Sequence, residues 1–562
     1  MRREVGVVNK KVCSFPILFA LLALLIGTCA VVFPASAQAA PTSTGSITVS
    51  GTVASSYDAY QIFSANVVDG DSDAKIATDL AWASDAVRDA ALPVLHGAGM
   101  LKSQTTAQEA AEWLNTDSHL TSALSAQLAR SLQSSGAVPV ALNAGTAAEL
   151  PCGYWLIVAD DDAIAQGEVG TAPIMALVGG SAVTVKPKAA TPKVQKHVLE
   201  DGTAAWQKAA DATVGDDLYW RLSATVPAGL TAYDTYTVRF VDTMSAGLDP
   251  SKVAASMRVY AAAGADGGFD AVQTGKDGRA GTEPAKGWTD ITAQCATKVA
   301  ADGTFTVRTG DLIAALGGAD AFAAGARVVA VYNAPLNSAC NHGIAKGNPN
   351  EVYLRYPRSP FADQSGDAGF THTPSDDACA YTWDLALTKR GSDGDKPLAG
   401  AVLSIADDRG RTLAADGTWD AEGKATVTTG EDGRVTVSGV DSGKLEVREL
   451  KAPKGYTAFE GTRSVTVKAE GLDVDQVAAA KPKLTITAES PLRADSADGS
   501  TGSLEASLIN TPTGTPPSIT TGGFMPSTGD MAMYAAAAAA VAGAAPIVVA
   551  LLVKRGGGSH KE

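Results

Sequence analysis

Strict alternation of apolar and polar residues over short segments is the feature that most limits what this chain can fold into. One such segment is closed by Pro227 and Gly229, and its apolar positions are Leu218, Trp220, Leu222, Ala224 and Val226. A period of two places one set of side chains on one face of a strand. Similar segments, separated by turns of Gly, Asp, Asn and Pro, fill most of the chain. We therefore predict a mainly β protein built of tandem immunoglobulin-like β-sandwiches.

Helical periodicity is confined to the first third of the chain. Its clearest stripe consists of Leu120, Leu124, Leu128 and Leu132. This spacing predicts one core-facing side of a helix, and Thr106 with Glu109 predicts a capping box. Alternating strands flank the helical part, so we expect an α+β domain at the N-terminus, ahead of the sandwiches.

The two ends of the chain carry segments that we expect to be processed. A basic start and an apolar run from Phe15 to Phe33 precede small-residue cleavage sites at 35–39, which is typical of a secretory signal peptide. At the other end, an apolar run over 531–553 is long enough to span a bilayer. Lys554 and Arg555 follow it and are expected in the cytoplasm.

A short word precedes the C-terminal apolar run, and it consists of Met525, Pro526, Ser527, Thr528 and Gly529. By itself the run is also consistent with a permanent anchor. With the word before it, the tail resembles a cell-wall sorting signal of Gram-positive bacteria, with Met in place of the usual Leu. The resemblance implies that a sortase transpeptidase cuts between Thr528 and Gly529.

These features divide the chain of 562 residues into seven parts. They are a signal peptide (1–39), an N-terminal domain (40–188), two β-sandwiches (189–382 and 383–512), a spacer with the sorting word (513–530), a membrane span (531–553) and a cytoplasmic tail (554–562).

Composition narrows the function classes. The formal net charge is -15, so nucleic acid is not an expected partner. No Ser/His/Asp or metal-binding set is evident, and we expect no cofactor, no metal and no turnover enzyme. Four cysteines lie in the mature part, namely Cys152, Cys295, Cys340 and Cys379. Secretion permits disulfides, so we expect one bond among the last three and leave the pairing open.

Three polar residues of the last sandwich fall on apolar faces of predicted strands. Lys389 continues the face of Leu385 and Leu387, and Glu449 and Asn510 stand in the same relation to their own strands. Buried charges are costly unless paired. The plain alternative places each residue at an exposed strand end. Their coincidence in the first, penultimate and last strands instead predicts self-chemistry, in which the Lys389 amine attacks the Asn510 amide with Glu449 as the acid.

The sequence around Glu449 resembles a known family motif. Segment 445–456, which reads Leu-Glu-Val-Arg-Glu-Leu-Lys-Ala-Pro-Lys-Gly-Tyr, is similar to the E-box of pilins and Cna B-type domains. The chain therefore resembles the sortase-assembled major (backbone) pilins of Gram-positive bacteria, which are isopeptide-forming fimbrial subunits. The resemblance implies Cna A/B-type sandwiches, a Lys389–Asn510 isopeptide bond and a proton-shuttling role for Glu449.

The preceding sandwich offers a similar but incomplete set. Lys196 and Asp242 point inward by the same alternation, but Arg358 occupies the position that matches the family's bonding Asn. Arginine has no carbonyl to attack, so we predict no isopeptide bond here. Asp242 is then vestigial and paired with Lys196 or Arg358. Asn348 and Asn350 remain as alternatives for the missing partner.

Lys188 bears on polymerisation. It ends the run Val-Thr-Val-Lys-Pro-Lys, which resembles the pilin motif with Lys186 in place of Tyr. The resemblance implies that the Lys188 amine attacks the sortase acyl-enzyme formed on Thr528 of the previous subunit. The plain alternative is a solvated linker, and Lys193 and Lys196 lie close enough for the assignment to slip.

We therefore predict the structural backbone subunit of a covalently polymerised surface pilus, secreted and wall-anchored, with a membrane-held precursor. The resemblance implies these partners: a pilus-specific class C sortase, a housekeeping sortase, identical subunits, minor pilins and peptidoglycan. The alternative is a wall-anchored monomeric adhesin, or a minor or tip pilin. In that case the first domain or a Gly-rich insertion at 261–284 contacts a host surface ligand or a glycan.

Overall fold

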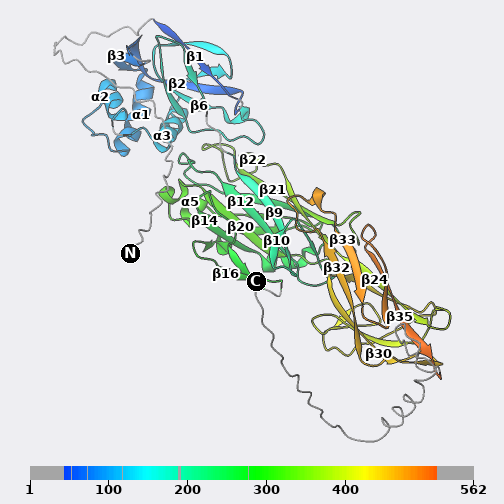
Figure 1. Cartoon of the computed structure of the whole chain (residues 1–562). Coiled ribbons are helices and arrows are strands. Elements are labelled where there is room, and N and C mark those ends of the chain that lie inside the picture. The colour runs from blue at the N-terminus through cyan, green and yellow to red at the C-terminus, as the bar shows by residue number, and fades with distance from the viewer. Residues whose placement is uncertain are drawn as a thin grey trace, which may run out of the picture.

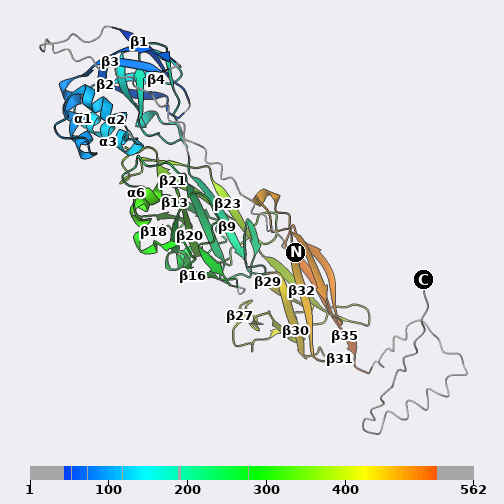
Figure 2. The same ribbon diagram turned by 60° about the vertical axis from the view of Figure 1, so that its left-hand side comes forward.

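The computed structural model describes residues 43–51, 53–71, 74–116, 118–187, 191–275 and 278–514. These residues form three bodies in a row along an elongated, mainly β molecule (Figures 1 and 2). Within the described ranges, no helix is long and apolar enough to cross a membrane. The predicted signal peptide and the predicted membrane span lie outside those ranges.

The first body places a five-stranded sheet between helices and a smaller sheet. The larger sheet has the order β3-β2-β6-β7 with β4 on β2, and its bounds are β2 Ser56–Asp69, β3 Lys75–Trp82, β4 Val140–Asn143, β6 Gly153–Ala159 and β7 Ile174–Val178. The smaller sheet has the order β5-β1-β8, with β1 Thr44–Val49, β5 Ala147–Pro151 and β8 Val183–Val185. The helices are α1 Asp85–Gly97, α2 Ala107–Leu114 and α3 Ser122–Ser134.

The central strand β2 explains this layering, because its two faces meet different partners. Tyr57 and Ala59 pack toward the smaller sheet, whereas Tyr60 and Ile62 pack against the helices. The helical stripe is confirmed in α3, where Leu124, Leu128 and Leu132 are buried; Leu120 lies before the helix, half-buried against the same core. The capping box of Thr106 and Glu109 is also confirmed at the start of α2.

The second body is a β-sandwich. One sheet has the order β10-β9-β12-β20-β14-β17, with β9 Lys193–Glu200, β10 Ala205–Gln207, β12 Tyr219–Val226, β14 Arg258–Ala263, β17 Thr289–Asp290 and β20 Ala326–Asn333. The other has the order β11-β23-β21-β13-β19-β18 with β22 on β21. Its bounds are β11 Ala209–Asp211, β13 Arg239–Met244, β18 Ala296–Val299, β19 Thr304–Arg308, β21 Asn348–Pro357, β22 Phe370–His372 and β23 Asp376–Tyr381.

The alternation of β12 is confirmed, since Trp220, Leu222 and Ala224 are buried between the two sheets. Three short helices each contribute buried residues to the core of this body, namely α4 Val253–Ser256, α5 Leu312–Ala315 and α6 Ala319–Phe322. The Gly-rich insertion forms a hairpin of β15 Val272–Thr274 and β16 Ala280–Pro284. This hairpin is not merely a surface loop, because Val272 packs with Tyr260 and Val329 in a small core on the outer face of the first sheet.

The third body is a second sandwich, drawn in yellow and orange in Figure 1. One sheet has the order β29-β24-β35-β31 with β34 on β35, and its bounds are β24 Trp383–Gly391, β29 Arg434–Val440, β31 Tyr456–Thr457, β34 Leu492–Asp498 and β35 Ser503–Pro512. The other has the order β27-β26-β25-β30-β32-β33 with β28 on β25. Its bounds are β25 Val402–Ala406, β26 Thr412–Leu413, β27 Trp419–Asp420, β28 Val427–Thr428, β30 Gly443–Lys451, β32 Thr462–Glu470 and β33 Lys483–Ala488.

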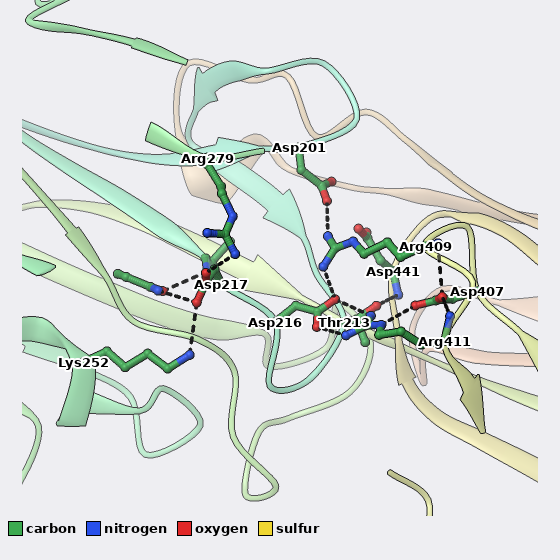
Figure 3. A network of polar contacts seen from close by, with 12 residues as sticks. Asp201, Thr213, Asp216, Asp217, Lys252, Arg279, Asp407, Arg409, Arg411 and Asp441 are labelled. Atoms are coloured by element: carbon green, nitrogen blue, oxygen red, sulfur yellow. Dashed lines mark hydrogen bonds and ion pairs between the residues drawn. The ribbon is translucent and has the colours of Figure 1, made fainter. Parts of the chain in front are cut away.

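A polar network joins the second and third bodies (Figure 3). Arg411 of the third body binds Asp216 of the second through two nitrogens, at 2.5 and 2.8 Å. Its Nε also donates to Asp407 at 2.7 Å, which orients the guanidinium. Arg409 adds contacts to Asp216 at 2.9 Å and to Asp201 at 3.4 Å. Charged groups from both bodies therefore hold this junction.

The expected disulfide is wrong, because all four cysteines of the described residues are free thiols. They lie on four separate segments. Cys152 stands before β6 in the first body, Cys295 follows a short 3-10 helix, Cys340 lies between β20 and β21, and Cys379 is on β23. Cys152 and Cys379 are fully enclosed and pack as small apolar side chains.

Candidate functional site

Lys389, Glu449 and Asn510 meet inside the third body, although they come from strands β24, β30 and β35. The Lys389 amine contacts Oδ1 of Asn510 and lies 3.1 Å from Oε1 of Glu449. The Asn510 amide nitrogen donates to the same Glu449 oxygen at 2.9 Å. All three are buried, with exposed fractions of 0%, 6% and 2% for Lys389, Glu449 and Asn510. The plain alternative of exposed strand ends is therefore wrong.

Strand register explains how the lysine and the asparagine come together. The first strand, β24, and the last strand, β35, run parallel and side by side, with Lys389 opposite Leu508 and Gly391 opposite Asn510. Lys389 and Asn510 thus face the same side of one sheet, two positions apart. Glu449 reaches them across the sandwich from β30, the strand that carries the E-box.

The environment favours a reactive amine. Burial lowers the pKa of Lys389 to about 8, and the nearby Glu449 opposes this shift only in part. The amine also lies 5.9 Å from the ring centre of Phe459, whose backbone N–H donates to the second Glu449 oxygen at 3.2 Å. Sequence reasoning missed Phe459, because an aromatic residue after the E-box carries no distinctive signal.

This arrangement can form an amide between two side chains. A neutral lysine amine is a nucleophile, and its contact with the Asn510 amide oxygen brings it beside the carbon it would attack. Glu449 touches both the attacking amine and the amide nitrogen that would leave. One carboxyl group can therefore take the proton from the first nitrogen and deliver it to the second.

A second set of polar groups lies in the core of the second body. The Lys196 amine contacts Oδ2 of Asp242 and lies 3.0 Å from the hydroxyl of Tyr332. That hydroxyl donates to Asp242 at 3.1 Å and accepts from the Asn350 amide nitrogen at 2.9 Å. Burial lowers the pKa of Lys196 to about 8 and raises that of Asp242 to about 6, and the attraction between the two charges opposes each shift.

The structure distinguishes among the residues that the sequence left open here. Asp242 contacts Lys196, whereas the Arg358 guanidinium donates to the backbone oxygen of Asp161 at 3.2 Å. The Asn348 amide is occupied by Asn341 and by the backbone of β23. Asn350 instead faces the Lys196 site, and its Oδ1 has no hydrogen-bond partner among the described residues.

Tyr332 is the member of this set that sequence reasoning missed. It is fully buried on β20 and shares the inward face of Val328 and Ala330. A tyrosine at the end of an apolar alternation is normally read as core packing, and only its hydroxyl distinguishes it. A buried tyrosine hydroxyl needs a polar partner, which is the signal that could have pointed to this site.

The remaining predicted site residues lie outside the described ranges. These are Lys188 and the word formed by Met525, Pro526, Ser527, Thr528 and Gly529. The chain leading to Lys188 is described up to Pro187, and its last strand, β8, pairs in parallel with β1. Among the described residues, no cluster of His, Cys, Asp or Glu could hold a metal ion.

These features define a class of protein in which consecutive β-sandwiches each enclose a lysine, an acidic residue and an asparagine. Residues 384–481, which lie within the third body, match the model of the SpaA family, described as a prealbumin-like fold domain. A curated relative is the trypsin-resistant surface T6 protein of Streptococcus pyogenes serotype M6, at 30% identity over 143 residues. That alignment spans 24% of this chain and 24% of the relative, or about a quarter of each.

Solved structures add three comparisons. The T6 backbone pilin of S. pyogenes serotype M6 aligns at 17% identity and a TM-score of 0.45, over 84% of this chain and 98% of that chain. The major pilin SpaD of Corynebacterium diphtheriae aligns at 15% identity and a TM-score of 0.40, over 84% of this chain and 98% of that chain. The major pilin BcpA of Bacillus cereus aligns at 11% identity and a TM-score of 0.38, over 84% of this chain and 99% of that chain. The predicted resemblance to Gram-positive backbone pilins is confirmed by the family model and the curated relative.

Proposed function

We propose that this chain is the structural backbone subunit of a covalently polymerised surface pilus. The observation that supports this most is the buried contact of Lys389, Glu449 and Asn510. Lys389 and Glu449 lie in the range 384–481 that matches the SpaA family, and a curated relative of the chain is a surface protein. The proposed subunit is secreted, anchored to the cell wall and without turnover activity.

The proposed self-chemistry is balanced within the site. The Lys389 nitrogen attacks the side-chain carbonyl carbon of Asn510, and Glu449 polarises the amide. Glu449 then passes a proton from the attacking nitrogen to the leaving one, the bond from the carbonyl carbon to the amide nitrogen breaks, and ammonia departs. The product is one isopeptide bond, which forms once in each copy.

Such a bond suits a protein that is pulled. The chain enters the third body at β24 and leaves it at β35, so tension on the ends would otherwise separate these two strands. Lys389 and Asn510 are 121 positions apart, and a crosslink between them carries the load past the intervening chain. The domain then stays folded under force, as a thread of joined subunits requires.

Joining is proposed to occur through a pilus-specific sortase, which links Thr528 of one copy to Lys188 of the next. A housekeeping sortase then attaches the finished fibre to peptidoglycan, and minor pilins join the same polymer. The strand β8, paired in the first body, supports this by holding the chain three residues before Lys188. The residues after β35 would serve as the spacer that presents the cleavage word.

Lys188→Ala tests the polymer. Wall extracts of cells with the unaltered chain are expected to show a ladder of high-mass species that resists SDS, and Lys188→Ala should abolish it. Lys186→Ala and Lys193→Ala are the matched controls and should leave the ladder intact. A ladder that survives in Lys188→Ala contradicts the assigned lysine. A wall-anchored monomer in the unaltered strain supports the alternative, an adhesin or a minor pilin.

A further inference from the structure

A cleft of about 550 Å³ opens on the outer face of the first sheet of the second body. It lies between strands β10 and β12 and the hairpin of β15 and β16, on the opposite side of the sheet from the Lys196 site. The side chains that matter for its chemistry are Trp206, Arg221, Asp270, Gln273 and Thr274. Its volume is in the range of cavities that bind small molecules.

Arg221 is a buried cation without a close acceptor. Its side chain is 9% exposed, and its Nε has no hydrogen-bond partner among the described residues. Its Nη1 has two contacts, to the Phe269 backbone oxygen and to Asp270, both at 3.4 Å. The Asp270 side chain is 88% exposed, so solvent screens that pair. Burial lowers the pKa of Arg221 to about 10, in keeping with an incompletely neutralised charge.

The neighbours of Arg221 are also unsatisfied. His197 lies directly opposite it on β9, and Ser223 follows two positions along the same face. The His197 Nδ1 and the Ser223 Oγ are buried and have no partner among the described residues. The pKa of His197 is lowered to about 3 by burial and by the nearby Arg221 and Lys208 charges. Unpaired buried polar groups are rare in native proteins, and these two lie beside Arg221 on the same face of the sheet.

The cleft combines the Arg221 cation with an aromatic ring and with polar groups that can form hydrogen bonds to hydroxyls. The Arg221 guanidinium lies 5.0 Å from the ring centre of Trp206, which holds it in place by a cation–π contact. Gln273 and Thr274 add amide and hydroxyl groups, and the exposed Asp270 carboxylate accepts hydrogen bonds from hydroxyls. A ligand with one acidic group, several hydroxyls and an apolar face matches this set, because arginine binds carboxylates through paired hydrogen bonds.

We propose that this cleft binds an acidic sugar unit of an oligosaccharide, with its carboxylate directed to Arg221. The sugar's hydroxyls meet Gln273, Thr274 and Asp270, and its apolar face lies along Trp206. This role is independent of the polymer proposed above. It would give each subunit of a fibre, or a single anchored chain, its own contact to an acidic glycan.

Titration of the full-length chain with defined oligosaccharides tests the proposal, with tryptophan fluorescence and calorimetry as readouts. The probes are sialyl- and glucuronyl-terminated oligosaccharides and their neutral counterparts without the acidic unit. Acidic probes are expected to bind at least about tenfold more tightly than neutral ones, the difference that one charged hydrogen-bonded contact supplies.

Two variants and one control connect the binding to the cleft. Arg221→Met should remove the preference for acidic probes, and Gln273→Ala, at an exposed position of the hairpin, should weaken binding several-fold without affecting folding. The matched control is Arg327→Met. Arg327 lies on the same outer face of the sheet, with its guanidinium 5.1 Å from the ring centre of Trp288. It donates hydrogen bonds to the backbone oxygens of Gly264 and Gly268.

Three outcomes would overturn the proposal. Neutral and acidic probes that bind equally would remove the role of the charge. Equal losses in Arg221→Met and Arg327→Met would remove the role of the cleft. An acidic peptide that binds as tightly as the acidic sugar would show that the cleft recognises charge alone.

Discussion

Lys389 and Asn510 are 121 positions apart in the chain, yet the amine of one contacts the amide oxygen of the other inside the third body. They stand on neighbouring parallel strands, the first and the last of that sandwich. Glu449 lies within hydrogen-bonding distance of both. Three polar side chains that would each destabilise an apolar core if left alone therefore satisfy one another, and they are arranged as reactants.

Removing any reactant should prevent the bond. Lys389→Ala, Glu449→Ala and Asn510→Ala are each expected to show the full mass calculated from their own sequences, whereas the unaltered chain should be lighter than calculated by the ammonia that the bond releases, about 17 Da. Loss of a crosslink closing so long a loop should also lower the free energy of unfolding of this domain by about 4–5 kcal/mol in the chain-entropy estimate. Mass spectrometry and thermal unfolding measure the two effects.

Lys444→Ala is the matched control for these variants. Lys444 lies on β30 in the same domain and pairs with Glu446 at the surface, with both side chains about half exposed. Its loss should leave the mass deficit in place and change stability by less than about 1 kcal/mol. A full mass deficit in Glu449→Ala would contradict the role of Glu449 as the acid.

The second body is predicted to stay unbonded, with Lys196 and Asp242 as a direct ion pair whose two members also contact the Tyr332 hydroxyl. The unaltered chain should therefore show one loss of about 17 Da and not two. Asn350 is the residue that decides the alternative, because it reaches the same tyrosine hydroxyl as Lys196. A second loss that disappears in Asn350→Ala, but persists in Asn348→Ala, would show that this body also reacts.

The sequence was sufficient to predict the fold class and the inward position of the odd residues, because alternation has a period that strands obey. Trp220 and Leu222 on β12, and Lys389 on β24, lie on the predicted faces. What brings Lys389 next to Asn510 is the parallel register of β24 and β35, and register between distant strands leaves no local trace in a sequence.

The errors have the same origin. The distance of Asn350 from Lys196 depends on how β9 and β21 are placed, so the sequence left Asn348 and Asn350 as equals. The expected disulfide was inferred from secretion and from cysteine number, whereas its formation requires that two sulfurs lie close together. The cleft at Arg221 was missed because the sequence of the covering insertion predicts a Gly-rich surface segment, and Val272 packs against the sheet only in the folded hairpin.

Acid should stabilise the junction of the second and third bodies through Glu200. Burial, together with Asp211 and Asp201, raises the pKa of Glu200 from 4.5 to about 8. The stabilisation from its bound proton is complete below pH 4.5 and is lost as pH rises through about 8. Glu200→Gln mimics the protonated form, so this variant should lose less free energy of unfolding than the unaltered chain between pH 5 and pH 8.

Denaturant unfolding at several pH values checks this prediction, and the difference between the two chains isolates Glu200 from other titrating groups. His197 acts in the opposite direction, because its pKa is lowered to about 3 and its stabilising effect is lost as pH falls. Asp441, half-buried in this junction, has a pKa raised by desolvation and by the nearby acidic groups, and it adds to the Glu200 effect. Parallel pH profiles for the two chains would contradict the assignment to Glu200.

Arg411 should determine how firmly the second and third bodies are joined. It donates hydrogen bonds to Asp216 through two nitrogens and to Asp407 through a third. The side chains of Arg411 and Asp216 are largely buried, at 21% and 12% exposed. Arg411→Ala leaves two carboxylates without their shared partner, which should lower the free energy of unfolding by about 1–3 kcal/mol and loosen the junction.

Arg434→Ala is the matched control, because Arg434 pairs with Glu505 at the surface of the third body and should contribute less than about 1 kcal/mol. Small-angle scattering and limited proteolysis of the full chain should show a more flexible junction only in Arg411→Ala. Identical behaviour of the two variants would mean that apolar packing, and not this charge network, holds the bodies together.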